Sequence, residues 1–184
     1  MCRAVRGPGG WGEAPIVSVA AGLFKADSGQ VLHKGQTIVN PPEDLGYLLQ
    51  RDRRFPWLTI RDKACLGLRV RKDESEASQR RVDDLLKSTG LWEFRNAFPA
   101  QLSGGMRPRA ALVRTLAVKP EFLLLDEPFS ALDSQTRVKI SDEVKQTIVE
   151  HGCTALLVTH DISEAVSMAT RVVVLSKRPA AIKS

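Results

Sequence analysis

Two adjacent carboxylates, Asp126 and Glu127, are the residues whose types and spacing indicate chemistry most directly. They follow the short apolar run of residues 122–125. A carboxylate pair at the tip of a buried strand is costly unless something uses it. An Asp there can hold Mg²⁺, directly or through water, and the neighbouring Glu can polarise a water for attack on a phosphate. A solvated loop after a strand is the ordinary alternative, and the stretch that follows, residues 128–133, disfavours it.

Two further groups of residues suit a phosphate ligand. Ser103, Gly104 and Gly105 stand where a helix is expected to begin, and free N–H groups there bind anions with the help of the helix dipole. His160 follows a second apolar run and can donate to a γ-phosphate. In isolation, a Ser-Gly-Gly stretch is more often a simple helix cap, and a lone His is more often a structural residue.

A glycine-rich loop near the first residue is the third phosphate-binding candidate. Its glycines, which can present backbone N–H groups to phosphates, are Gly7, Gly9, Gly10 and Gly12. Gln50 is a weaker candidate, because a side-chain amide oxygen can ligate Mg²⁺ but most glutamines are surface residues.

The elements that must position these residues alternate between strand and helix, which predicts an α/β layered fold. Because polar residues follow several apolar strands, we expect a ligand crevice at the carboxyl edge of a parallel sheet. The expected strands are residues 3–6, 30–33, 36–39, 45–49, 122–125, 154–159 and 171–175, and the expected helices are 16–23, 104–118 (capped by Ser103), 134–150 and 161–169.

The middle of the chain has a different pattern, helical and rich in charge. Residues 74–87 carry Val82, Leu85 and Leu86 on one face of an expected helix. We therefore expect a small helical subdomain, at about residues 59–100, within a single domain that spans residues 1–184.

Composition excludes several classes of protein. The 184 residues, 43% hydrophobic and 26% charged, suit one globular domain. Three widely spaced cysteines argue against a disulfide scaffold and favour a reducing compartment. No apolar run approaches the roughly 20 residues of a membrane helix, and residues 1–6 lack the apolar core of a signal peptide. The net charge of +6 needs no explanation beyond solubility, although a phosphate ligand, a membrane surface or nucleic acid would also suit it.

Taken in order, these motifs resemble those of the ATP-binding subunit of ABC transporters, over nearly the whole chain. Residues 101–107 look like the signature motif, residues 123–133 like Walker B with the D-loop, and residues 158–161 like the segment of the switch His. Residues 55–59 and Met106 look most like the importers of nitrate, sulfonate, taurine and bicarbonate. The implied fold is that of a P-loop NTPase, a mainly parallel sheet flanked by helices.

The resemblance implies a role for each candidate residue. Glu127 would be the general base, His160 the sensor of the γ-phosphate, and Asp126 with Gln50 would place Mg²⁺. Ser103, Gly104 and Gly105 would bind ATP held on a second subunit, and Asp133 would communicate across that dimer. The implied partners are this second subunit, a membrane permease reached near residues 55–58, and indirectly a solute-binding protein. Nucleic acid is not among them, and the implied location is peripheral, on the cytoplasmic face of the membrane.

The sequence departs from the family at the glycine-rich loop. A P-loop continues with Lys and Ser or Thr, whereas Glu13 and Ala14 stand here, so the loop is a degenerate Walker A motif. Pro15 is tolerable in a first helical turn, and Pro108 is expected to remove a backbone hydrogen bond from the signature helix. Only residues 3–6 precede the loop as a strand, which suggests a chain incomplete at its N-terminus.

Three readings stay open. The chain is an ATPase subunit of an ABC importer for a small anionic solute, or a non-hydrolytic partner that donates residues 103–105 to another subunit's P-loop, or a degraded gene product with little activity. A repair-type ABC ATPase that acts on nucleic acid is suggested by the basic charge alone.

Overall fold

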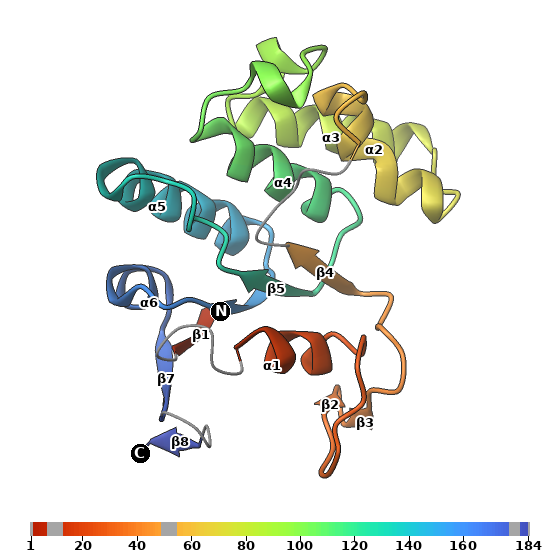
Figure 1. Cartoon of the computed structure of the whole chain (residues 1–184). Coiled ribbons are helices and arrows are strands. Elements are labelled where there is room, and N and C mark those ends of the chain that lie inside the picture. The colour runs from red at the N-terminus through yellow and green to blue at the C-terminus, as the bar shows by residue number, and fades with distance from the viewer. Residues whose placement is uncertain (1, 7–12, 49–54, 177–180, 184) are drawn as a thin grey trace.

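The fold is built on one central sheet, seen in a computed structural model that describes residues 2–6, 13–48, 55–176 and 181–183. Within these residues the sheet has six strands in the order β4-β5-β6-β1-β7-β8 (Figure 1). Neighbouring strands are parallel except β7 and β8, which pair antiparallel at the edge. The strands are β1 (Cys2–Arg6), β4 (Leu45–Leu48), β5 (Phe122–Asp126), β6 (Thr154–Val158), β7 (Arg171–Leu175) and β8 (Ile182–Lys183). The predicted α/β fold with a mainly parallel sheet is therefore confirmed.

Helices cover both faces of this sheet, and the alternation of side chains along β5 explains how. Leu124 packs with Val17 of α1 (Glu13–Ala20) on one face. Leu123 and Leu125 point to the other face, into the larger core. That core is closed by α4 (Met106–Leu116), α5 (Ser134–Glu150) and α6 (Ile162–Met168). All three leucines of β5 are fully buried, as expected of a central parallel strand.

The predicted helical segment forms two helices that stand away from the sheet, beyond α4 (Figure 1). They are α2 (Ile60–Val70), whose N-cap is Thr59, and α3 (Glu76–Ser88), whose N-cap is Ser75; two short 3₁₀ turns, η1 (Trp92–Phe94) and η2 (Pro99–Gln101), follow. The face of α3 predicted to be apolar is buried. The boundaries of a subdomain at about residues 59–100 stay a prediction.

Two predictions about α4 are wrong. The helix begins at Met106 after an N-cap at Gly105 that makes no side-chain hydrogen bond, so Ser103 does not cap it. Instead, the carbonyl of Ser103 accepts from the N–H of Met106 at 3.2 Å. Pro108 is the third residue of the helix, where a backbone N–H has no partner within the helix. The proline therefore removes no intrahelical hydrogen bond.

Other elements differ from expectation mainly in length. The helix expected at residues 16–23 begins three residues earlier, so Pro15 lies in its first turn, as predicted. The two short strands are only two residues each, β2 (Leu32–His33) and β3 (Gln36–Thr37). The residues between them, Lys34 and Gly35, both have positive φ, which matches the tight turn that such a hairpin needs.

A cluster of charges fastens this hairpin to the sheet. The carboxylate of Asp44, just before β4, lies 2.7 Å from Lys34 Nζ and 2.9 Å from His33 Nε2. Lys34 also reaches Glu121, just before β5, at 2.8 Å. Hydrogen bonds from Lys34 and then His33 lower the pKa of Asp44 to about 2. The ionised carboxylate is thus the form that the folded chain favours.

We predict that Asp44→Asn lowers the free energy of unfolding by about 1 kcal/mol at pH 6, the upper end for a solvated ion pair. Because the folded pKa lies below the ordinary value of 3.8, this contribution is present above about pH 4 and is lost as the pH falls toward 2. Urea unfolding of both proteins from pH 6 to pH 3 measures the difference. A difference that does not shrink below pH 4 would contradict the assignment.

Candidate functional site

Two of the predicted catalytic residues meet at the carboxyl ends of β5 and β6. Asp126 pairs with Val158 in the parallel register, and the N–H of Glu127 continues the ladder to the carbonyl of Val158 at 2.9 Å. His160 stands two residues beyond that carbonyl. Its Nδ1 lies 2.6 Å from Oε1 of Glu127. The structure therefore brings Glu127 and His160 into direct contact, which no motif in the sequence indicates.

Glu127 occupies a backbone conformation that side chains rarely adopt. Its φ is +45°, in the left-handed region where residues other than glycine are strained. Ser130 Oγ and the contact with His160 hold the residue from two sides, since the hydroxyl donates to the carbonyl of Glu127 at 3.0 Å. Strain of this kind collects at functional sites when the surroundings enforce it. It supports a special use for this carboxylate.

The pair is unequally exposed. The side chain of Glu127 is 17% exposed and that of His160 is 51% exposed. An exposed imidazole in contact with a largely covered carboxylate can meet a ligand from solvent while it orients the carboxylate behind it.

Asp126 has a neighbour that sequence reasoning missed. Tyr47 of β4 donates its hydroxyl to Oδ2 of Asp126 at 3.4 Å. Burial raises the pKa of Tyr47 to about 12, and the negative charge of Asp126 adds to the rise. The phenol therefore stays protonated and remains a donor. The sequence indicates this contact only weakly, because Tyr47 and Asp126 lie on different strands.

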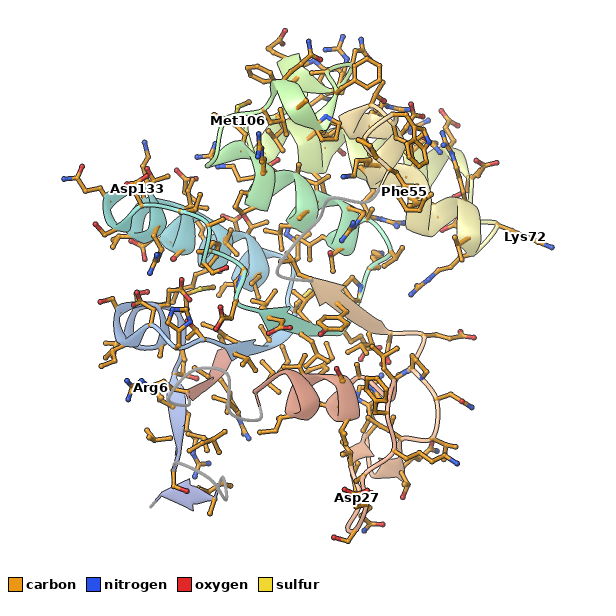
Figure 2. All side chains as sticks on the ribbon, viewed as in Figure 1. Arg6, Asp27, Phe55, Lys72, Met106 and Asp133 are labelled. Atoms are coloured by element: carbon orange, nitrogen blue, oxygen red, sulfur yellow. The ribbon has the colours of Figure 1, made fainter. Side chains whose placement is uncertain are left out.

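The glycine pair and Asp133 form a second group, built on the first turns of α4 and α5 rather than on strand ends. A Cβ on Gly105 would lie 3.3 Å from Thr136 Cγ2, so the glycine lets α4 approach α5 closely. Ser103 and Gly104 are exposed. Figure 2 marks the starts of the two helices by Met106 and Asp133, on the same side of the molecule.

Asp133 also has a structural role. Its Oδ1 accepts from the N–H of Thr136 at 3.0 Å, which makes it the N-cap of α5. This hydrogen bond lowers the pKa of Asp133. The carboxylate is ionised at the positive end of the helix dipole, which stabilises the start of α5.

Several predicted site residues lie outside the described residues, namely Gly7, Gly9, Gly10, Gly12 and Gln50. What surrounds the glycine-rich loop is clear: β1 ends at Arg6 and α1 begins at Glu13. The loop thus joins the carboxyl end of a central strand to the start of a helix, the context in which a P-loop binds phosphate. Glu13 and Ala14 are the first two residues of that helix.

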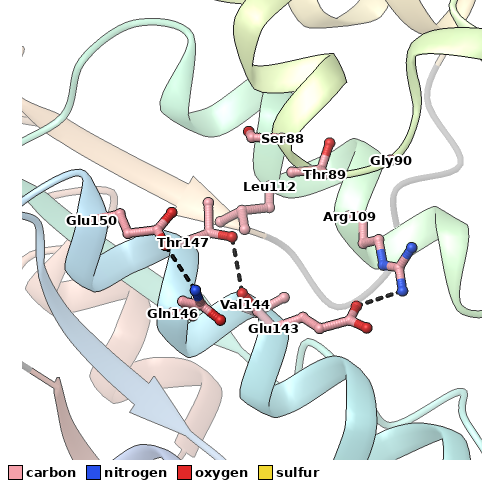
Figure 3. Close-up of a pocket in the computed structure, with 10 residues that line it drawn as sticks. All are labelled: Ser88, Thr89, Gly90, Arg109, Leu112, Glu143, Val144, Gln146, Thr147 and Glu150. Atoms are coloured by element: carbon pink, nitrogen blue, oxygen red, sulfur yellow. Dashed lines mark hydrogen bonds and ion pairs between the residues drawn. The ribbon is translucent and has the colours of Figure 1, made fainter.

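The cavity drawn in Figure 3 lies elsewhere. Its volume is about 360 Å³, and the end of α3, α4 and the second half of α5 line it. Arg109 and Glu143, which both line the cavity, form an ion pair. None of the predicted site residues lines it. In the part of the chain that the structure describes, no group of three or more His, Cys, Asp or Glu side chains suits a metal ion, and no helix is long and apolar enough to cross a membrane.

Comparison with known proteins shows which family the chain is similar to. Residues 2–130 match the family model described as ABC transporter. The chain is 43% identical over 176 residues to YtlC of Bacillus subtilis, an uncharacterized ABC transporter ATP-binding protein, covering 96% of this chain and 68% of that protein. It is 39% identical to a putative ATP-binding protein of Brucella abortus, covering 95% of this chain and 67% of that protein. The sulfate/thiosulfate import ATP-binding protein CysA of Mycobacterium bovis is 40% identical, with 95% of this chain and 50% of that protein covered.

The family model covers more than half of the chain and includes residues 103–105, residues 126–127 and three strands of the central sheet, β1, β4 and β5. The chain belongs to the ABC transporter family. Its similarity is to ATP-binding proteins of that family, so the class is that of the ATP-binding subunit.

We predict that Glu127→Gly is more stable than Glu127→Ala by about 1 kcal/mol, because both lose the carboxylate but only alanine keeps the cost of a positive φ. Chemical unfolding of the two variants at equal concentration measures the difference. Equal stability, or a more stable alanine variant, would show that Glu127 does not hold this conformation in solution.

Proposed function

We propose that this chain is the ATP-binding subunit of an ABC importer that takes up a small anionic solute. The contact between Glu127 and His160, beside Asp126 at the ends of β5 and β6, is the observation that carries the proposal. Family membership supports the class. A relative named for sulfate and thiosulfate import supports an anionic solute. The choice of nitrate, sulfonate or taurine rests on the importer-like residues 55–59 alone.

Each residue then has a role in the binding or hydrolysis of ATP. Glu127 orients and polarises the attacking water, and His160 meets the γ-phosphate while its Nδ1 holds the Glu127 carboxylate in place. Asp126 offers oxygen ligands that suit Mg²⁺, an ion that keeps several waters and needs few protein ligands; Gln50 is the second expected ligand. When bound, Mg²⁺ neutralises phosphate charge. The glycines of residues 7–12 cradle the phosphates at the start of α1.

Residues 103–105, of which Ser103 and Gly104 are exposed, face a partner in this proposal. Ser103 and Gly104 are open to a nucleotide on a second ATP-binding subunit, and Asp133 lies close by at the start of α5. The permease would meet Trp57, which is 68% exposed and stacked edge-on against Phe55. The chain would work at the cytoplasmic face of the membrane, with a solute-binding protein as an indirect partner and no nucleic acid.

A second candidate function follows from the two residues that begin α1. In the sequence, the acidic Glu13 stands at the position where the P-loop motif has its phosphate-binding Lys, and Ala14 at the position of the Ser or Thr hydroxyl that ligates Mg²⁺. The chain would then be a non-hydrolytic partner that completes another subunit's site with residues 103–105. A degraded product without activity is the outcome if neither function is found.

We predict that the chain alone hydrolyses ATP negligibly and that Glu13→Lys with Ala14→Ser raises its affinity for Mg-ATP. A charge pair at about 4 Å is worth about 4 kcal/mol at an effective dielectric of about 20, so the gain is at least tenfold and up to about a thousandfold. Calorimetric titration and phosphate release measure binding and turnover. The matched control adds Glu127→Gln, which should keep binding and lose turnover. Robust Mg-dependent turnover by the unaltered chain would contradict this interpretation of Glu13 and Ala14.

The partner function makes a separate prediction. Mixing the chain with a co-encoded subunit that has an intact P-loop should restore ATP turnover, because residues 103–105 complete the partner's site. Ser103→Arg should abolish the restoration, since a long side chain fills the exposed surface, while the same change at the exposed Ser28 should not. Phosphate release against subunit ratio gives the result. No restoration with any co-encoded subunit would leave the degraded-product reading.

A further inference from the structure

We propose that Arg137, on the first turns of α5, is a positioning residue that holds His160 against Glu127. The inference rests on the proposed use of that pair in ATP hydrolysis. Arg137 acts through the two turns that carry the pair, one after β5 and one after β6.

The first half of the argument is the contact of Arg137 with the turn after β6. Nη1 of Arg137 forms an ion pair with Oδ2 of Asp161, the residue that follows His160. Nε lies 3.7 Å from Oε1 of Glu164. Arg137 is only 20% exposed and Glu164 is 3% exposed, so these charges are largely removed from water. Deleting one member of such a group leaves the others buried without compensation.

The residue before His160 belongs to the same network. The Thr159 hydroxyl donates to Oε2 of Glu164 at 2.5 Å and accepts from the N–H of Asp161 at 3.0 Å. Asp161 Oδ1 in turn accepts from the N–H of Glu164 at 3.1 Å and caps α6. Arg137 therefore contacts Asp161 directly and Thr159 through Glu164, the two residues on either side of His160. The backbone of His160 is held from both sides.

The second half is the contact of Arg137 with the turn after β5. Nη2 donates to the carbonyl of Leu132 at 2.9 Å. That turn starts at Glu127, whose carbonyl accepts from Ser130, and it continues through the buried Phe129. A single guanidinium thus bridges the turn that begins with Glu127 and the turn that contains His160. A lysine cannot make this bridge, because it carries one point charge instead of a planar fork of donors.

The experiment follows the His160 ring by NMR in the full chain labelled at histidine. The chain has three histidines, so His160→Gln assigns the signal, and Glu127→Ala gives its position when the pair is lost. We expect Arg137→Met to move the His160 signal most of the way to that position. Arg137→Lys should move it in the same direction but less far, since the charge beside Asp161 is kept and the bridge to Leu132 is lost.

Arg109→Met is the matched control. Arg109 also joins α5 by an ion pair, to Glu143, and is 23% exposed, close to the value for Arg137. It should leave the His160 signal at its original position. A shift as large as that of Arg137→Met would show a general loosening of α5 and overturn the proposal.

The NMR experiment tests the role of Arg137 without any measurement of ATP turnover. A folded Arg137→Met variant with an unmoved His160 signal overturns the proposal, and so does an unmoved signal in Glu127→Ala, which would mean that the pair does not form. If circular dichroism shows Arg137→Met to be unfolded, Arg137→Lys decides in the same way. Failure of the proposed function is seen separately, as absent ATP turnover in the Glu13→Lys, Ala14→Ser chain and in the mixed subunits.

Discussion

The parallel hydrogen bonding of β5 with β6 is the constraint on which the candidate site depends. It places Asp126 opposite Val158 and extends by one bond, from the N–H of Glu127 to the carbonyl of Val158. Beyond this hydrogen bond, the segments that follow β5 and β6 leave the sheet side by side, and Glu127 contacts His160. A slip of one residue would turn the buried leucines of β5 to the wrong faces, so core packing fixes the register and the register fixes the pair.

Much of this arrangement could be predicted from local patterns. The apolar run that ends at Asp126 indicated a buried strand, and the helix expected at residues 134–150 has those bounds. The contact of Glu127 with His160 could not be predicted, because local sequence carries no information on the register of strands joined by a long connection. The same holds for Tyr47, which reaches Asp126 only through the pairing of β4 with β5.

Both errors about α4 concern its first residue, because the helix begins at Met106 and was expected from residue 104. Ser103 has the side chain of an N-cap, yet the N-cap is Gly105, where a Cβ would lie 3.3 Å from Thr136 Cγ2 of α5. The free N–H groups expected at Gly104 and Gly105 predict an anion site. The close approach of Gly105 to α5 is a second reason for glycine at position 105, and that reason holds with or without a nucleotide.

Helix α5 is therefore the element through which both groups of candidate residues are placed. Its N-cap is Asp133, Thr136 in its first turn lies beside Gly105, and the next residue, Arg137, reaches the carboxylate of Asp161 next to His160. The backbone strain at Glu127 requires surroundings that enforce it. A helix buried through Ile140, Val144 and Ile148 supplies a rigid base for those surroundings, since these side chains belong to the main core. The same 17 residues thus contact both the group that would face a partner and the turns that carry the Glu127–His160 pair, which would face a phosphate.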